Sequence, residues 1–472
     1  MSKIIALLLV LVFLTSLTTL PQVTVKAVSK SIIVPDDYPT IAAAIGNATN
    51  GDTILIRSGN YLENSLTIDK TVSLIGENAQ NTIIRNIDQP TMYLGSPLFA
   101  GPTAITVKAN NVIISRLTVV TNNNGADILG YDIAGGGSGT QILNNNLPEG
   151  ILLSSGSYQL ITQNNIGQIA DHFAIVSEAP YTYITNNTVT GGIKLQKPYS
   201  SGLLNNVLYA NSITTTTNSY YWEAWGITIY MTAGNLIAKN NITNSRAGIV
   251  NDLSSYNTII GNTITNSYIG LATIQGGGEN TFSGNNIISN SYSVAIAGYN
   301  DTFYGNNFLN NAQEIGSPDM LLGPNPSPVT FWYRGTQGNY WSNYTGLDEN
   351  EDGIGDTPYV IDANNMDPYP LMAPFNLTTV ILPEWASNIS PAALPSTFPA
   401  PTPTPFPSPS PSPSPTISPA PSPTSSPSPE PTLSPEPTPI PEPYPILLVS
   451  AVSVAAIAVA AGVLVYFKKR RH

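Results

Sequence analysis

The strongest constraint on the fold of this chain is a repeat of about 22 residues in its middle. Segments such as NLIAKNNIT, NTIIGNTIT and NTFSGNNII share alternating apolar residues, then asparagine, then a second apolar pair. Arg116 occupies the asparagine position one repeat earlier. The aligned asparagines, 20 to 29 residues apart, are Asn144, Asn164, Asn186, Asn211, Asn240, Asn262, Asn285 and Asn306.

This period excludes most repeat folds. It is too short for a propeller blade, and the chain lacks the leucine-rich repeat pattern. A β-sandwich would not explain the regular register. We therefore expect an all-β chain folded as a parallel β-helix of about 10–13 coils, which stack at the ~4.8 Å strand spacing. Asparagine suits the turns because it tolerates left-handed backbone angles, and stacked amides can bond to one another as a ladder.

The N-terminal part continues the repeat more loosely. A strand is followed by a short amphipathic helix at residues 40–47 and then by paired strands. We expect the helix to cover the open end of the stack, which would otherwise expose apolar surface and unpaired backbone groups.

Two stretches resemble a known group of proteins. VPDDYPTIAAAIGNATNGDTILIRSGNYLENSLTIDKTVSLIGE resembles the opening of right-handed parallel β-helix proteins of the pectin-lyase-like superfamily. GNYWSNYTGLDENEDGIGDTPYVIDANNMDPYPLMAPF resembles the C-terminal region of NosD-like proteins, a group named for a periplasmic copper-binding protein. The resemblance covers about residues 31–375. It implies the fold far more specifically than an activity, because one fold hosts many functions.

The ends of the chain predict a membrane-anchored surface protein. Residues 1–27 have the short positive start and apolar core of a secretory signal peptide. Residues 391–445 are rich in Pro, Ser and Thr and predict an extended linker. Residues 446–467 are uncharged and long enough to span a bilayer, and the basic tail at 468–472 predicts a cytoplasmic C-terminus. The head would therefore lie outside the cell.

The composition of the chain limits the kinds of molecule that it is expected to bind. The chain has 17 basic and 29 acidic residues, a formal net charge of −12, which makes nucleic acid an unsuitable partner. It has no cysteine, so disulfides do not stabilise it. Seven glycosylation sequons fit an extracellular glycoprotein, at Asn47, Asn186, Asn241, Asn300, Asn343, Asn376 and Asn388.

The sequence assigns no catalytic residues. Motifs of the polygalacturonase type (NTD, GHG and RIK) and of the pectate-lyase type are absent, and the one Asp-Asp pair precedes the expected capping helix. Weak candidates are Asp171 and His172, where the imidazole could act as a general base, and Asp252. Glycoside hydrolysis needs two carboxyl groups on one face, and the repeat does not align two.

Copper delivery is not expected despite the family name. Copper sites use Cys, Met or His. Between the signal peptide and the apolar C-terminal run there is no cysteine, one histidine and no cluster of methionines.

Aromatic residues gather in two places. The first group falls in the longest repeat, between Asn211 and Asn240, and we expect it to form an outward loop that binds carbohydrate by stacking; it comprises Tyr220, Tyr221, Trp222, Trp225 and Tyr230. The second group, within residues 331–344, either seals the end of the core or binds ligand.

The acidic stretch LDENEDGIGDTPYVID, within residues 345–368, predicts a calcium loop. Ligand positions 1, 3, 5, 7 and 9 hold Asp348, Asn350, Asp352, Ile354 through its carbonyl, and Asp356, with Gly353 at the turn. Position 12 is Tyr359, so the loop is not a complete EF-hand, and Asp362 or Asp367 would close the ligand shell. Calcium would stabilise the C-terminal end of the fold.

Three functions remain open. The first is binding of polysaccharide or glycoprotein at the cell envelope. The second is cleavage of polysaccharide at a non-standard acidic site, which requires carboxylates from different coils within ~5–10 Å. The third is a structural role in a surface layer, which predicts self-association.

Overall fold

The computed structural model describes residues 29–88, 103–121, 131, 133–167, 173–197, 202–215, 224–275, 277–316 and 330–381. The predicted signal peptide, linker, membrane-spanning segment and basic tail lie outside these ranges. Within them, no helix is long and apolar enough to cross a membrane.

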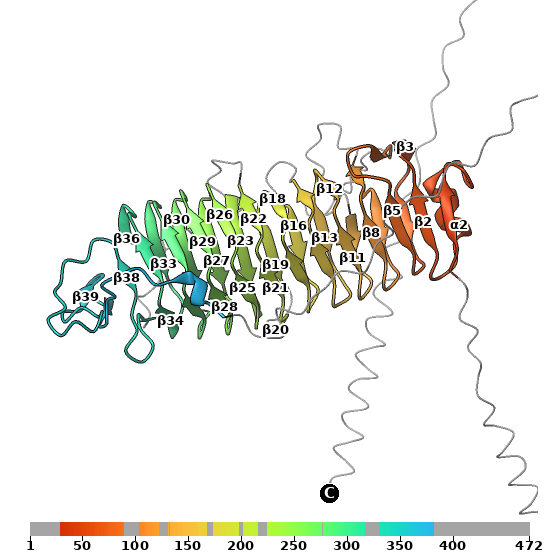
Figure 1. Ribbon diagram of the computed structural model, residues 1–472. Coiled ribbons are helices and arrows are strands. Elements are labelled where there is room, and N and C mark those ends of the chain that lie inside the picture. The colour runs from red at the N-terminus through yellow and green to blue at the C-terminus, as the bar shows by residue number, and fades with distance from the viewer. Residues whose placement is uncertain are drawn as a thin grey trace, which may run out of the picture. The chain divides into compact units, whose positions relative to one another are not determined.

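The chain forms a right-handed parallel β-helix, in which three parallel sheets run along one stack of coils (Figure 1). Apart from the first pair, β1 and β2, neighbouring strands in these three sheets are three or four places apart in the sequence. The 13-stranded sheet contains β1 (Ser31–Val34), β2 (Thr53–Ile56), β5 (Ser73–Gly76), β8 (Ile113–Ser115), β11 (Gln141–Leu143), β14 (Leu160–Thr162), β17 (Tyr183–Thr185), β21 (Val207–Tyr209), β25 (Leu236–Ala238), β28 (Thr258–Ile260), β31 (Thr281–Ser283), β34 (Asp301–Tyr304) and β37 (Thr330–Phe331).

The other two sheets follow the same order along the stack. The 11-stranded sheet contains β4 (Leu66–Ile68), β7 (Ile105–Val107), β10 (Ile133–Gly135), β13 (Ile151–Leu153), β16 (Ile175–Ser177), β19 (Ile193–Gln196), β23 (Trp225–Tyr230), β27 (Ala247–Asp252), β30 (Ile269–Ile274), β33 (Tyr292–Ile296) and β36 (Gln313–Gly316). The 12-stranded sheet contains β3 (Gly59–Glu63), β6 (Thr82–Asn86), β9 (Thr118–Val120), β12 (Asn146–Leu147), β15 (Asn165–Ile166), β18 (Thr188–Thr190), β22 (Ser212–Thr214), β26 (Asn241–Thr243), β29 (Thr263–Thr265), β32 (Asn286–Ile288), β35 (Asn307–Leu309) and β38 (Tyr340–Trp341). Two small pairs are β20 (Gly202–Leu203) with β24 (Thr232–Ala233), and β39 (Tyr359–Val360) with β40 (Met366–Asp367).

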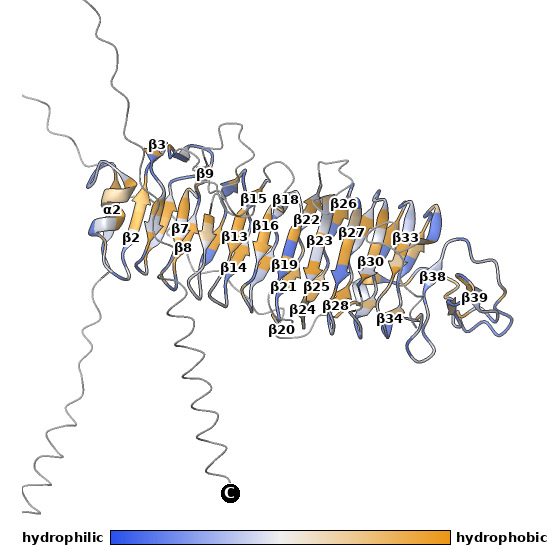
Figure 2. Ribbon diagram, turned by 180° about the vertical axis from the view of Figure 1, so that it is seen from behind, coloured by the Kyte–Doolittle hydropathy of each residue, from blue (hydrophilic) through white to orange (hydrophobic). Residues whose placement is uncertain are grey.

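The core is a set of apolar columns inside the coils. Ile237, Ile259, Phe282 and Phe303 occupy matching positions on successive strands and are fully buried. Each coil alone could not bury its apolar face, so stacking supplies the driving force for the fold. Figure 2 shows the result, with apolar strands and polar turns.

The helix α2 (Ile41–Asn47) covers the N-terminal end of the stack, as expected (Figure 1). Thr40 caps it, because its hydroxyl oxygen accepts a hydrogen bond from the Ala43 amide at 3.1 Å. Ile41, Ala44 and Ile45 are buried on its inner face.

A ladder of buried side-chain amides runs along the corner between the 13- and 12-stranded sheets. At nearly every step the backbone N–H and the amide Nδ2 of one asparagine donate to the Oδ1 of the asparagine on the next coil. The members are Asn145, Asn164, Asn187, Asn211, Asn240, Asn262, Asn285, Asn306 and Asn339, and the ladder ends on the Asp367 carboxylate.

Two predicted ladder positions are wrong by one residue. Asn144 and Asn186 lie directly before ladder members, at a turn position with φ of 56° and 55°. Arg116 shares that turn position, with φ of 58°. A left-handed backbone and a ladder amide both favour asparagine, so adjacent asparagines satisfy both needs and the alignment cannot separate them.

Polar ladders also occupy the other two corners, which the sequence analysis missed. One ladder lies where the strands of the 13-stranded sheet begin. In it, the backbone N–H of each member donates to the side-chain oxygen of the next, in the order Asn206, Asn235, Asn257, Asn280 and Asp301. Before the 11-stranded sheet the order is Ser245, Ser267, Asn290 and Asn311. Each turn thereby satisfies buried backbone donors that would otherwise lack partners.

Aromatic rings seal the C-terminal end of the core. Trp332 and Trp341 are buried and pack against Phe303 and Phe308, with ring centroids 4.9 and 4.2 Å apart for the two stacked pairs. Phe331 and Tyr333 are exposed beside them. For the two tryptophans, the structure therefore selects the sealing role that the sequence left open.

After this seal the chain turns back along the stack. Asn307 Oδ1 accepts a hydrogen bond from the Phe375 backbone N–H at 2.7 Å, and Asn307 Nδ2 donates one to the Phe375 carbonyl at 2.9 Å. The short 3-10 helix η4 (Leu377–Thr379) follows, and Val380 lies over Gly261 and Gly284. The segment covers the corner of the last coils because these glycines present no side chain there.

Candidate functional site

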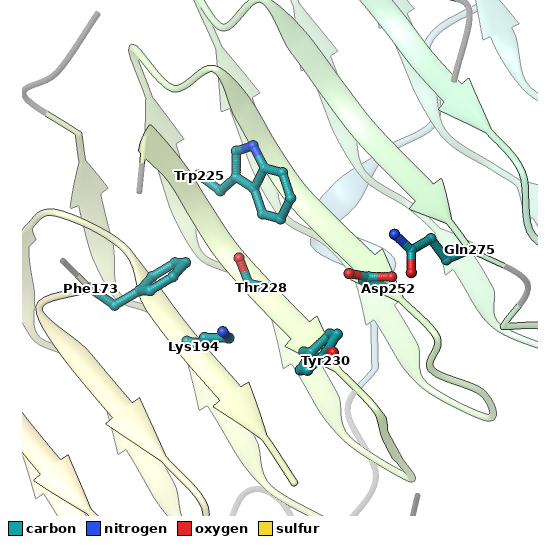
Figure 3. A pocket seen from close by; sticks show the side chains of 7 residues that line it. All are labelled: Phe173, Lys194, Trp225, Thr228, Tyr230, Asp252 and Gln275. Carbon is teal, nitrogen blue, oxygen red and sulfur yellow. The ribbon is translucent and has the colours of Figure 1, made fainter. Parts of the chain in front are cut away.

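A pocket of about 280 Å³ opens on the outer face of the 11-stranded sheet (Figure 3). Its walls come from consecutive coils: residues on β19, β23 and β27, one just before β16 and one just after β30. The lining residues are Phe173, Lys194, Trp225, Thr228, Tyr230, Asp252 and Gln275.

The alternation of the strands turns four of these side chains outward: Lys194, Thr228, Tyr230 and Asp252. In β23, Ile227 and Ile229 are fully buried in the core, so Thr228 and Tyr230 project from the opposite face. The register places Thr228 beside Lys194 of β19 and Tyr230 beside Asp252 of β27. Figure 3 shows the row from Phe173 at one end to Asp252 and Gln275 at the other.

The apolar wall of the pocket is aromatic. Phe173 and Trp225 belong to a second hydrophobic cluster, which covers the outer face of this sheet and is separate from the main core. The Lys194 ammonium lies 5.5 Å from the centroid of the Phe173 ring and 5.1 Å from that of Tyr230. Cation–π attraction to both rings therefore helps to position this charge.

Three buried polar atoms in the pocket have no hydrogen-bond partner among the described residues: Trp225 Nε1, Thr228 Oγ1 and Asp252 Oδ1. The exposed fractions of these side chains are 6%, 2% and 5%. Buried polar atoms in folded proteins are nearly always paired, because an unpaired one costs about 1–3 kcal/mol. A ligand with hydroxyl groups would supply the missing partners.

Asp252 also has unusual proton affinity. Burial raises its pKa to about 6, against the opposing effect of the Lys194 charge. The carboxyl can therefore gain or lose a proton near neutral pH. It is the only carboxylate that lines the pocket in the part of the chain that the structure describes.

The structure unites three of the residues singled out in the sequence. Trp225 and Tyr230, predicted to bind carbohydrate, meet Asp252, a weak catalytic candidate, in one pocket. Asp171, His172, Tyr220, Tyr221 and Trp222 lie outside the described residues.

The expectation of an outward loop is wrong for residues 225–230, which form β23. The residues that lengthen this repeat precede the strand, between β22 and β23.

The sequence analysis did not identify four of the residues that line the pocket: Phe173, Lys194, Thr228 and Gln275. For Lys194 and Thr228 a signal exists, because each interrupts an apolar pair (IKL and ITI) at an outward position.

The acidic loop lies at the C-terminal end of the stack. Asp348 accepts hydrogen bonds from the Asp352 and Gly353 amides at 3.1 and 2.8 Å, and Asp352 accepts from the Ile354 amide at 2.9 Å. Asp356 accepts from the Glu349 amide at 2.7 Å. The loop is tied to the return segment through the Met372 amide, which donates to the Gly353 carbonyl at 3.0 Å.

The carboxylates proposed to close this loop are engaged elsewhere. Asp362 binds the Asn364 and Asn365 amides in its own turn, and Asp367 ends the asparagine ladder. As the side chains of the described ranges are arranged, no three Asp, Glu, His or Cys residues converge on a common metal position.

Comparison with known proteins gives one family match. The NosD family, described as periplasmic copper-binding protein, matches residues 206–346. This confirms the resemblance seen in the sequence. The matched segment contains neither cysteine nor histidine, so it lacks the usual copper ligands other than methionine. No curated protein matches the chain.

Solved structures with a similar fold share little sequence. The A-module of a mannuronan C-5 epimerase from Azotobacter vinelandii is 15% identical, with 62% of this chain and 93% of that chain covered and a TM-score of 0.40. An alginate lyase in complex with G6 is 12% identical, with 65% and 86% covered and a TM-score of 0.44. The Dettilon tailspike protein is 15% identical, with 66% and 61% covered and a TM-score of 0.41.

The family match lies within the stack of coils and includes β23 and β27, which carry Trp225, Tyr230 and Asp252. The chain is therefore a right-handed parallel β-helix protein that is similar to the NosD family over residues 206–346.

Proposed function

We propose that this protein binds a carbohydrate chain in the pocket formed by β19, β23 and β27, as a receptor for polysaccharide or glycoprotein at the cell envelope. Its place on the outer side of a membrane rests on the sequence alone, through the signal peptide, linker and apolar C-terminal run. One observation supports the binding function: in one pocket, aromatic side chains lie beside three buried polar atoms that have no hydrogen-bond partner among the described residues.

Sugars match this combination. The C–H face of a sugar ring is apolar and packs on aromatic rings, while its hydroxyl groups both donate and accept hydrogen bonds. Trp225 Nε1 can only donate, an ionised Asp252 can only accept, and the Thr228 hydroxyl can do either. A carbohydrate chain that lies along the pocket offers donors and acceptors that match all three atoms.

Removal of the Thr228 hydroxyl tests this proposal. We expect Thr228→Val to weaken glycan binding by about 3- to 10-fold, because it deletes one hydrogen bond of ~1 kcal/mol to the ligand. The same change should leave thermal stability equal or higher, because the hydroxyl has no hydrogen-bond partner in the part of the chain that the structure describes. Binding is measured by titration calorimetry of the full chain against a panel of neutral and acidic oligosaccharides.

Two further variants serve as a positive and a negative control for binding in the pocket. Trp225→Ala should lower affinity by at least about tenfold, since it removes a large stacking surface. Tyr299→Ala removes an exposed aromatic side chain that does not line the pocket and should leave affinity unchanged. Equal binding by the wild type, Thr228→Val and Trp225→Ala would place the glycan elsewhere.

A second candidate function is cleavage of the bound chain, which the raised pKa of Asp252 favours. A buried carboxyl that titrates near neutral pH suits a general acid or base. Hydrolysis by the usual route needs a second carboxyl group. New reducing or unsaturated ends in the same incubations, lost in Asp252→Asn, would establish cleavage. A lack of both binding and cleavage would favour the structural role.

We also propose that calcium binds the loop at Asp348, Asn350, Asp352 and Asp356. Support comes from the dense oxygen donors and from the turn at Gly353, where φ is 83°. Because the loop holds the return segment, calcium should raise the melting temperature of the full chain, and a chelator should lower it. Asp352→Asn should abolish the difference, whereas Asp362→Asn, outside the loop, should preserve it. A melting temperature insensitive to calcium would exclude this site.

A further inference from the structure

We propose that the pocket selects uncharged sugar units over acidic ones, and that Asp252 makes this distinction. The inference rests on the proposed binding function and names the ligand class of the same pocket. It starts from the position of the carboxyl group, which is 5% exposed, lines the pocket and leaves Oδ1 without a partner in the described structure.

The charged surroundings of Asp252 are simple. Of the strands packed against β27, β23 contributes Tyr230 as its one titratable side chain and β30 contributes none. One strand further, Lys194 of β19 supplies the positive charge that acts on Asp252. That ammonium lies over the rings of Phe173 and Tyr230. Among the described residues, the pocket lining therefore holds one negative and one positive group, in a chain of formal net charge −12.

An ionised Asp252 discriminates between ligands by charge. A sugar hydroxyl can donate to Oδ1 in a charge-assisted hydrogen bond. A uronate or sulfate brings a second anion to the same place, where burial reduces screening by water and repulsion is strong. Lys194 cannot neutralise two anions. Neutral sugar units therefore fit the pocket, and acidic units are rejected.

The discrimination should depend on pH. Burial raises the pKa of Asp252 to about 6. Above this value the carboxylate repels an acidic sugar. Below it the neutral carboxyl can donate a hydrogen bond to the same sugar, so the preference should fade.

Matched pairs of oligosaccharides test the inference. The pairs are oligogalacturonate with its methyl ester, oligomannuronate with mannan oligomers, and oligoglucuronate with cello-oligomers of equal length. For the pair that binds the full chain, we expect the neutral member to bind at least about tenfold tighter at pH 7.5, and the ratio to fall below about threefold at pH 5.

Variants separate the pocket charge from the net charge. Asp252→Asn should bind both members of the pair within about threefold at either pH. Glu178→Gln changes the net charge equally, but Glu178 does not line the pocket and contacts Gln196 instead, so it should keep the wild-type preference. The pH dependence of the wild type gives the same information if Asp252→Asn does not fold.

The outcomes distinguish this inference from the proposed function. Tighter binding of the acidic member at pH 7.5, or a preference unchanged by both Asp252→Asn and pH, would overturn the selectivity and leave carbohydrate binding intact. A failure of every pair to bind would overturn both.

Discussion

Replacement of Asn262 by leucine is expected to lower the free energy of unfolding by about 3–5 kcal/mol. The Asn262 side chain accepts hydrogen bonds from the backbone N–H and Nδ2 of Asn240, both at 2.9 Å. It donates to the Ile237 carbonyl at 2.8 Å and to Asn285 Oδ1 at 3.0 Å. Leucine removes these four bonds. The buried Asn240 N–H then loses its acceptor, which costs about 1–3 kcal/mol, and each of the other lost bonds adds about 1 kcal/mol. Asn240 Nδ2 keeps its bond to the Leu208 carbonyl, and Asn285 Oδ1 keeps the bond from the backbone N–H of residue 262.

Asn241→Ala is the matched control for this change. Asn241 is the first residue of β26 and directly follows the ladder member Asn240, but its side chain is exposed. Its removal should change stability by less than about 0.5 kcal/mol. Unfolding in urea, followed by circular dichroism, measures both variants. A loss below about 1 kcal/mol for Asn262→Leu would show that the ladder is not a major source of stability.

Replacement of Trp332 by alanine should be nearly as damaging, with a loss of about 3–5 kcal/mol. The Trp332 side chain is 1% exposed and stacks on Phe303 at a centroid distance of 4.9 Å. Its Nε1 donates to Asn365 Oδ1 at 3.1 Å, which ties the end of the core to the acidic loops. The alanine variant creates a cavity and opens the last coil to water.

The neighbouring aromatic residue provides the comparison. Phe331 is 42% exposed, so Phe331→Ala should lose much less stability. Hydrogen exchange locates the effect, because the amides of β34 and β35 should exchange faster in Trp332→Ala than in Phe331→Ala. Equal protection in the two variants would argue against a sealing role for Trp332.

The coil stack was predictable because its signal is local. Alternating apolar residues recur on each coil because each coil buries the side chains that point into the stack. A turn asparagine recurs with them because each coil makes the same turn. The capping helix was predictable for the same reason. The one-residue errors at Asn144 and Asn186 arose where two adjacent asparagines serve different needs, one for a left-handed backbone and one for the ladder.

The second ladder had a signal that was not used. The repeat segments NVLYANSI, NLIAKNNIT, NTIIGNTIT, NTFSGNNII and DTFYGNNFL each begin with the amide or carboxylate that forms it. The terminal Asp301 is also readable in retrospect. Its segment is the last of the five, and the Asp side chain accepts hydrogen bonds from Asn280 but has no amide group to donate to the next strand, β37.

The pocket could not be found in this way. Its lining residues extend from Phe173 to Gln275, over about 100 positions, and the repeats between them differ in length by up to seven residues. The sequence by itself determined the coils, the apolar core and the covered N-terminal end. Each coil buries its apolar face in the same way, so the pattern of apolar residues repeats about every 22 residues and is visible along the chain. Only the tertiary structure decided that Trp225, Tyr230, Lys194 and Asp252 meet, because outward side chains become neighbours through the register of stacked strands rather than through any spacing along the chain.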